Sequence, residues 1–382
     1  MRPLILVSIA LIFGLGLIMV FNTSSAEILD RSLNRDTHYA LVRQLAYAFV
    51  GCLLALLVWK VGYHHFLKLS PFLLSVVMVL LILVFIPGIG KVRNGAHRWI
   101  GFNSFTFQPS EFVKYLLPMV FIEWVMQHKE ISLLSFCKIM GILTIPIFLV
   151  MIEPDNGTAA VMGVSLIPLF FMSGIRFKYW MLPLVLLLAF GSVALYQFPY
   201  VRARINVYLH PELDLKGKGH QPYQAKIAAG SGKLLGRGPG ASLQKLTYLP
   251  EAQNDYIAAI YAEEFGFLGI LLLILLYMLV AYGGISVAMR SDTISGSYLA
   301  MSITFLITFQ AFLNLGIVSG LLPSKGVNLP FFSQGGTSLI TNIIGLTLLL
   351  NLAKHAKKTS DSQRWRDRGT PLSRTGPSSN SF

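Results

Sequence analysis

The chain has 382 residues, of which 54% are hydrophobic and 13% charged, and its formal net charge is +14. An ordinary soluble domain carries about 25% charged residues. The composition therefore excludes a soluble globular protein and indicates a chain that lies in lipid. We expect membrane lipids, and no nucleic acid, among its partners.

Apolar segments long enough to cross a bilayer recur along almost the whole chain. A bilayer core of roughly 30 Å needs about 20 mostly apolar residues per helix. Membrane barrels alternate apolar and polar residues, whereas these runs are continuous. The predicted fold class is an all-α polytopic integral membrane protein with one large extracytoplasmic loop and about ten transmembrane helices, at residues 3–21, 44–62, 69–87, 112–127, 134–152, 158–173, 178–198, 256–286, 297–318 and 335–353.

The first span and the cysteines bear on processing and redox chemistry. The first apolar stretch exceeds the 7–15 residues of a secretory signal core, so we expect it to be retained as a span.

The two cysteines, Cys52 and Cys137, fall inside predicted spans. They support neither a disulfide framework nor a cysteine-based metal site, and we interpret them as packing residues.

Two regions organise the chain. Residues 1–355 form the predicted membrane domain, with a large outer loop at about 199–255. Residues 356–382 are rich in Ser, Arg, Lys and Pro, and this composition is typical of a disordered tail. Basic segments that flank spans lie in the cytoplasm, so the C-terminus and, with ten spans, the N-terminus are predicted to be cytoplasmic.

The outer loops carry a second set of basic residues. Two interpretations stay open: basic loops without a specific role or resting on anionic lipid head groups, and a binding site for a polyanion such as a pyrophosphate. These residues are Lys91, Arg93, Arg98, Arg202, Arg204, Lys216, Lys218, Lys226, Lys233, Arg237, Lys245 and Lys325.

Four polar segments fall in odd-numbered connections, which all face the same side of the membrane. They are residues 93–114, 153–158, the end of the large loop at 249–255, and 320–326. Ionisable residues at the mouths of spans tend to face a wet cavity and are functional candidates. The sequence therefore predicts that the four segments converge on one composite site.

Several of these residues also have a purely structural interpretation. Glu111 and Lys114 are three residues apart at a helix start, so they share a face and can neutralise each other. Asp255 heads the eighth span, where a carboxylate can serve as a cap or a partner of the helix dipole. The glycine-rich segment at 230–240 lacks the context of a phosphate loop or a dinucleotide fingerprint, and its glycines are expected to allow tight turns near a ligand or the membrane.

Five ordered blocks resemble the SEDS family (shape, elongation, division and sporulation proteins) of FtsW/RodA-type peptidoglycan glycosyltransferases, over roughly residues 1–355. Lys325-Gly326 is similar to the division branch, FtsW, whereas Gln334 and Ala225 depart from the family pattern. The blocks are Asn94-Gly95-Ala96 with Arg98-Trp99; Gln108-Pro109-Ser110-Glu111-Phe112 with Lys114; Pro154-Asp155 with Gly157-Thr158; Leu249-Pro250-Glu251 through Asp255 with Glu263-Glu264; and Leu322-Pro323-Ser324-Lys325-Gly326 with Leu329-Pro330-Phe331-Phe332-Ser333.

The resemblance implies an enzyme that adds lipid II to a growing glycan strand at the outer face of the bacterial cytoplasmic membrane, in septal wall synthesis. By similarity, Asp255 is the catalytic carboxylate, suited to act as a general base. A divalent cation, Mg²⁺ or Mn²⁺, is a possible cofactor. The expected partners are a class B penicillin-binding transpeptidase and other divisome proteins. The implied substrate-binding residues are Arg98, Glu111, Lys114, Asp155, Gln224, Lys226, Lys245, Glu251 and Lys325.

Two other functions stay open at this point. A flippase that carries lipid II across the membrane would also need polar residues in spans and a basic cavity for the lipid head. A scaffold that only recruits other wall enzymes would leave the charges of the outer loops dispensable.

Overall fold

The computed structural model describes residues 1–30, 36–93, 96–102, 105–128, 130–183, 185, 208–210, 214, 217, 219–246, 249, 252–324 and 326–355. Most of the predicted seventh span, much of the large loop, Glu251, Lys325 and the tail at 356–382 lie outside these residues.

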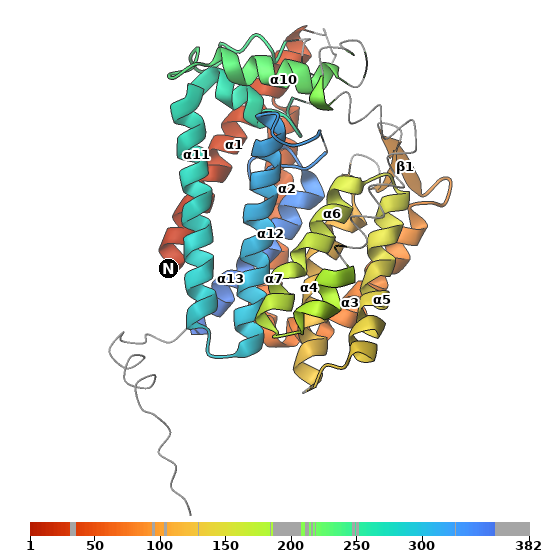
Figure 1. Cartoon of the computed structure of the whole chain (residues 1–382). Coiled ribbons are helices and arrows are strands. Elements are labelled where there is room, and N and C mark those ends of the chain that lie inside the picture. The colour runs from red at the N-terminus through yellow and green to blue at the C-terminus, as the bar shows by residue number, and fades with distance from the viewer. Residues whose placement is uncertain are drawn as a thin grey trace, which may run out of the picture.

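The described chain is a bundle of helices with a small sheet at one end (Figure 1). The sheet is antiparallel with strand order β1-β2-β3, and it belongs to the connection between α3 and α4. The elements are α1 (Arg2–Asp30), α2 (Tyr39–Val61), α3 (Tyr63–Leu83), β1 (Gly90–Arg93), β2 (Ala96–Phe102), β3 (Phe105–Phe107), α4 (Pro109–Gln127), α5 (Leu133–Ile152), α6 (Asn156–Ser165), α7 (Ile167–Met172), α10 (His220–Ser231), α11 (Ile257–Arg290), α12 (Ile294–Val318) and α13 (Gly336–His355).

Seven of the described helices are long and apolar enough to cross a membrane: α1, α2, α3, α5, α11, α12 and α13. The fourth predicted span corresponds to α4, which carries charged residues, and the sixth corresponds to the short pair α6 and α7. The polytopic helical class is confirmed. The count of ten stays a prediction.

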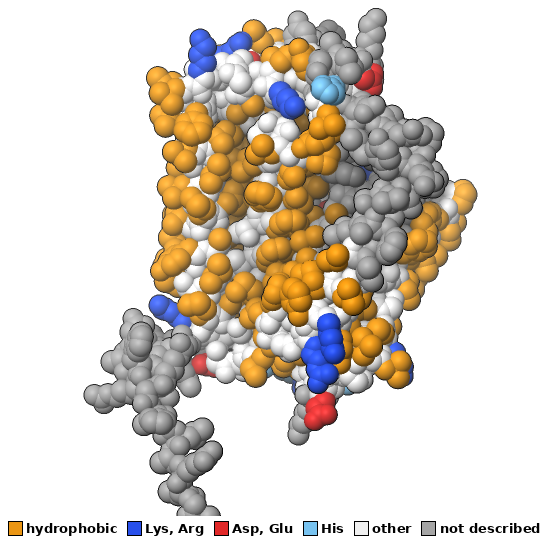
Figure 2. Space-filling model, in the orientation of Figure 1, with side chains coloured by type: hydrophobic (Ala, Val, Ile, Leu, Met, Phe, Trp, Pro, Cys, Tyr) orange, Lys and Arg blue, Asp and Glu red, His pale blue; other side chains and the backbone are white. Residues whose placement is uncertain are grey.

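Apolar side chains cover the middle of the molecule, and charged side chains gather toward its two ends (Figure 2). The exposed apolar residues include Phe267, Leu271 and Met278 on α11. Cys52 and Cys137 lie within α2 and α5 as predicted, but both are exposed. Their interpretation as packing residues is therefore wrong, because their side chains face outward from the bundle.

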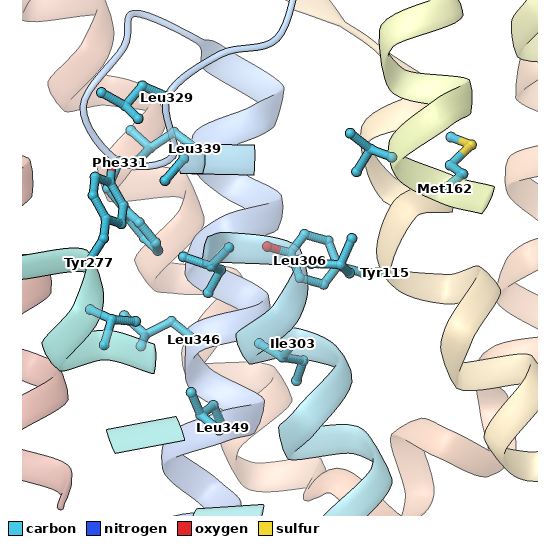
Figure 3. Packing of buried hydrophobic residues seen from close by; sticks show 14 of the residues in the cluster. Tyr115, Met162, Tyr277, Ile303, Leu306, Leu329, Phe331, Leu339, Leu346 and Leu349 are labelled. Carbon is cyan, nitrogen blue, oxygen red and sulfur yellow. The ribbon is translucent and has the colours of Figure 1, made fainter. Parts of the chain in front are cut away.

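The core lies among α4, α11, α12 and α13, where buried residues from distant parts of the chain meet (Figure 3). Tyr115 of α4 is buried in this core, and its hydroxyl donates to Asn342 Oδ1 of α13 at 2.7 Å. The Tyr277 hydroxyl of α11 donates to the carbonyl of Pro330 at 2.6 Å. These buried hydrogen bonds hold the polar ends of aromatic side chains inside an apolar core.

Helix α11 is interrupted at Gly266, whose φ of 68° and ψ of −164° are not helical. The segment after α10 fills this break. The amides of Arg237 and Gly238 donate to the carbonyls of Glu263 and Glu264, at 2.9 and 3.0 Å. Across the break, the amides of Phe267 and Leu268 donate to the carbonyls of Lys233 and Leu234. Backbone groups freed in a membrane helix must find such partners.

Close approach explains the glycines of this segment. A Cβ atom on Gly236 would lie 2.1 Å from the Glu264 carbonyl oxygen, and φ there is 81°. Both conditions require glycine. The expected tight turns are present, with positive φ at Gly236, Gly238 and Gly240, and the segment packs against a helix of its own chain.

The connection between α5 and α6 buries a carboxylate. Glu153 caps α5, its side chain is fully buried, and neither carboxylate oxygen has a hydrogen-bond partner among the described residues. The pKa of the Glu153 carboxyl is raised from 4.5 to about 8, chiefly by burial and also by the nearby Asp155 carboxylate, against the opposing effect of Arg98.

This pKa predicts a pH dependence of stability. Between about pH 4.5 and 8 the folded protein keeps a proton on Glu153 that the unfolded chain releases, so stability falls as pH rises through this window. Glu153→Gln should remove that component. The measurement is the thermal unfolding temperature in detergent at pH 5 and pH 8, with Glu130→Gln at an exposed position as control. An unchanged pH dependence in Glu153→Gln would show that Glu153 keeps an ordinary pKa.

Candidate functional site

A polar cavity of about 410 Å³ lies where the predicted polar segments meet. Its walls come from α1, α2, the sheet, α4, α6 and α12, together with the chain around residues 253–255, 326–328 and 334–336. The predicted convergence of the four odd-numbered connections is therefore confirmed. Five of the predicted site residues line the cavity: Arg98, Glu111, Lys114, Asp155 and Asp255.

Glu111 and Lys114 form a buried ion pair in the first turns of α4. Pro109 begins this helix one residue beyond the end of β3, and its fixed φ suits the first helical position. Lys114 Nζ lies 2.7 Å from Glu111 Oε2 and also donates to Gln310 Oε1 of α12, at 3.2 Å. The predicted pairing is confirmed, and the same two charges line the cavity.

Asp155 and Arg98 join the sheet to the start of α6. Asp155 is the N-cap of α6, and its Oδ1 accepts from the amide of Thr158 at 3.1 Å. Its Oδ2 lies 3.8 Å from Arg98 Nη1 and accepts from Gln108 Nε2 at 3.2 Å. Arg98 also donates to the carbonyls of residues 153 and 154, at 3.0 and 2.6 Å. The Asp155 carboxylate and the Arg98 guanidinium thus connect the sheet to α6 on this side of the cavity.

Asp255 lies at the start of α11, one residue before its N-cap Tyr256. Asn314 of α12 donates from Nδ2 to the carbonyls of Asp255 and Val327, at 2.8 Å each. A Cβ atom on Gly326 would lie 3.1 Å from Asp255 Oδ2, so the neighbouring backbone approaches the carboxylate closely. The main chain on both sides of this carboxylate is held by one buried amide.

The structure adds polar residues that the sequence analysis did not single out. Arg43 of α2 lines the cavity, lies over the Tyr47 ring at 5.6 Å, and donates to Thr106 Oγ1 at 3.1 Å. Gln44 and Gln310 line it too. The sequence could have indicated these residues, because polar residues within spans are costly and often functional. Arg43 was missed because the second span was predicted to begin one residue later.

Three predicted residues that the structure describes do not line the cavity: Gln224, Lys226 and Lys245. Lys245 Nζ donates to Glu264 Oε1 at 3.0 Å and to Asn22 Oδ1 at 2.7 Å, so this ammonium holds the loop against α11 and α1. Lys226 of α10 lies against Gly320. The cavity therefore does not support a role in substrate binding for these three residues.

The structure also shows whether side chains could hold the expected divalent cation. Within the described ranges, no group of three or more His, Cys, Asp or Glu side chains is placed to hold an ion. Three carboxylates line the cavity, but Glu111 is paired with Lys114, and Asp155 accepts three hydrogen bonds or charge contacts. The expectation of a divalent cation therefore stays a prediction.

The chain is similar to bacterial cell-wall proteins over most of its length. Stage V sporulation protein E of Bacillus subtilis (strain 168) is 36% identical over 359 residues, covering 93% of this chain and 97% of the relative. The probable peptidoglycan glycosyltransferase FtsW of Legionella pneumophila (strain Philadelphia 1) is 37% identical over 355 residues, covering 90% of this chain and 89% of that protein.

Solved structures share the fold. A chain of a peptidoglycan synthase complex that coordinates polymerization and crosslinking superposes with a TM-score of 0.77 at 24% identity, covering 93% of this chain and 98% of that one. The rod shape determining protein RodA of Thermus thermophilus superposes with a TM-score of 0.67, also at 24% identity, covering 93% and 97%. The sequence profile of the FtsW/RodA/SpoVE cell cycle proteins matches residues 2–358, and this chain belongs to that family.

Proposed function

We propose that the protein is a peptidoglycan glycosyltransferase that polymerises lipid II into glycan strands. The observation that carries the proposal is the position of Asp255 in a polar cavity that also contains Arg43, Arg98 and Lys114. Relatives of the chain at 34–37% identity are named probable peptidoglycan glycosyltransferases. The division-branch assignment rests on Lys325-Gly326 and on the name FtsW of these relatives.

Asp255 suits the chemistry of the acceptor. The attacking sugar hydroxyl must lose a proton as it bonds to the anomeric carbon of the donor, and a carboxylate within reach can accept that proton. The backbone carbonyl held by Asn314 and the close approach of Gly326 orient this side chain. Asp255 is therefore proposed as the general base.

The cations of the cavity suit the leaving group. A pyrophosphate departs without an acid when positive groups carry its developing charge. Lys114, Arg43 and Arg98 are the cationic side chains that line the described cavity. Arg98 and Lys114 belong to the set expected from the sequence and Arg43 is new, whereas Lys226 and Lys245 are held elsewhere.

We propose that a divalent cation binds only together with the substrate. Mg²⁺ is commonly held by one or two carboxylates together with substrate phosphates. Pyrophosphate oxygens would supply the main ligands, which leaves Asp255 free as the base, and the ion would offset charge on the leaving group. Titration of Mg²⁺ into substrate-free protein should then show no tight binding, whereas a stoichiometric site would contradict this assignment.

The wider setting is also proposed. Catalysis at the outer face places the cavity outside the cytoplasmic membrane, with both termini in the cytoplasm and the protein at the division septum. A class B penicillin-binding transpeptidase and other divisome proteins are the proposed partners; one structural neighbour is itself a chain of a peptidoglycan synthase complex.

Replacing the proposed base should abolish polymerisation. Asp255→Asn keeps the shape and removes the proton acceptor, so the rate should fall by about 10² to 10⁴. The assay is glycan polymerisation from lipid II by purified protein with the candidate transpeptidase, with Asp292→Asn in the α11–α12 connection as control. An unaltered rate in Asp255→Asn would exclude the role. Movement of intact lipid II across vesicles without polymer would instead identify a flippase.

The buried ion pair can be tested for a role beyond folding. Glu111→Ala or Lys114→Ala leaves one buried charge unpaired and should reduce stability as well as activity. Replacing both, with Glu111→Gln and Lys114→Met, removes the unpaired charge and should restore the unfolding temperature. Polymerisation by this double variant should stay at least about tenfold below that of the unaltered protein. A normal rate in the stable double variant would show that the pair is structural only.

A further inference from the structure

Asn328 lies in the connection between α12 and α13 and lines the cavity close to the proposed base. Two residues before it, a Cβ atom on Gly326 would lie 3.1 Å from Asp255 Oδ2. Two residues of chain span at most about 7 Å. The backbone of Asn328 therefore lies within about 7 Å of the glycine that faces the carboxylate.

Burial alternates along this segment. Val327 and Leu329 are 6% and 1% exposed, whereas Gly326 is exposed and Asn328 is half-buried. Successive residues of a non-helical, extended chain point to opposite sides. Gly326 and Asn328 therefore share the side of the segment that meets the cavity, while their neighbours pack into the core.

Hydrogen bonds fix the main chain on both sides of Asn328. Asn314 of α12 donates to the carbonyl of Val327 at 2.8 Å, and the amide of Leu329 donates to Ser333 Oγ at 2.9 Å. A binding group on a chain that is already ordered loses little conformational entropy when it meets its ligand.

A neighbouring glycine fixes the position of the Asn328 side chain. A Cβ atom on Gly335 would lie only 2.7 Å from Asn328 Nδ2, so the amide rests against the backbone of this residue. Gly335 also lines the cavity, and its own amide donates to Gln44 Oε1 at 3.3 Å. The Asn328 amide is therefore held at the cavity wall.

The side-chain amide of Asn328 is free to bind a ligand. Its polar atoms have no hydrogen-bond partner among the described residues, and they are not among the polar atoms that the protein seals off. Gln44, another amide of this wall, is occupied at both ends, because it also donates to the carbonyl of Ser333 at 3.3 Å. Gln44 thus holds the wall, whereas Asn328 presents an unused donor and acceptor.

We propose that Asn328 binds the acceptor sugar, through a hydrogen bond between its side-chain amide and an uncharged polar substituent of the ring whose hydroxyl Asp255 deprotonates. The inference rests on the proposed function and specifies one contact of its substrate site. Asn328 takes no part in the proton transfer, and it sets the position and the specificity of the acceptor.

The chemistry of the cavity separates the acceptor from the leaving group. A neutral amide offers two donors and one acceptor, which suits a hydroxyl or an acetamido group. A pyrophosphate is better matched by the cations Arg43, Arg98 and Lys114, which come from α2, the sheet and α4. Because the base acts on the acceptor, a neutral contact beside Asp255 belongs to the acceptor sugar.

Two variants of Asn328 separate the hydrogen bond from the shape of the wall. Asn328→Leu keeps roughly the size of the side chain and removes both polar atoms. Asn328→Ala removes them without adding bulk. Asn380→Leu, in the predicted cytoplasmic tail, is the matched control.

The decisive assay forms a single glycosidic bond, so that donor and acceptor are varied separately. The donor is lipid II in which the attacking hydroxyl is replaced by hydrogen. The acceptor is the disaccharide of lipid II as its methyl glycoside, which has no leaving group. Both Asn328 variants should raise the KM for the acceptor about tenfold, the size of one net hydrogen bond, and leave the KM for the donor within about twofold.

Acceptor analogues identify the group that Asn328 binds. One series replaces single hydroxyls by hydrogen, and a second replaces an acetamido group by a hydroxyl. The analogue that lacks the bound group should lose about tenfold in kcat/KM with the unaltered protein and nothing further with the variants.

The outcomes are distinct. An equal rise in the KM for the donor, or an unchanged KM for the acceptor, would overturn the assignment. Losses that add for every analogue would show that Asn328 holds water, and a loss confined to Asn328→Leu would trace the effect to bulk; either result overturns it. A fall in kcat with both KM values unchanged would indicate a structural role and also overturn it. Absence of bond formation by the unaltered protein would instead refute the proposed function.

Discussion

The buried contact from Glu111 through Lys114 to Gln310 is the interaction on which the cavity depends. A charge inside a helical bundle is costly unless it is paired and hydrogen-bonded, and the Lys114 ammonium contacts both the Glu111 carboxylate and the Gln310 amide oxygen, across α4 and α12. Because Lys114 holds the oxygen of Gln310, the amide nitrogen of that residue is turned away from it. The same contact that allows charges to be buried also orients a polar group beside the cavity.

The interruption of α11 fixes the start of this helix beside the cavity, because the loop after α10 binds to the helix at the break. Gly266 opens the helix, and the segment after α10 pairs with the freed backbone groups. Glu263 and Glu264 accept further hydrogen bonds from the amides of Leu243 and Gly240. Asp255 is thus held at the head of a helix whose first turns are anchored to their own loop.

The sequence predicted the helical membrane class, the convergence of alternate connections, and the presence of Asp255, Glu111 and Lys114 at one site. These follow from long apolar runs and from charges at the mouths of spans, which are local features. It did not predict the three-stranded sheet, because its strands are short and lie in a polar, glycine-containing connection. Nor did it predict that Lys245 meets Glu264, since that pairing depends on the fold of the loop over a broken helix.

Gln310 and Asn314 show why the remainder of the site needed a structure. Each is one polar residue in an apolar run, and nothing local distinguishes a satisfied amide from one with an atom left over. Only the positions of Lys114, Asp255 and Val327 reveal which atom of each amide is engaged. The sequence therefore identifies the charged residues of the site except Arg43, and the three-dimensional contacts identify Arg43 and the neutral residues.

The most direct test of the account is the sidedness of the segments that form the cavity. Single cysteines at Thr106, Asn254 and Asn328, which line it, are introduced after Cys52 and Cys137 are replaced by alanine. A membrane-impermeant maleimide added outside intact cells should label all three, and should label a cysteine at Asp292 only after permeabilisation. Labelling of any one of the three solely from the cytoplasmic side would contradict a shared active cavity at the outer face.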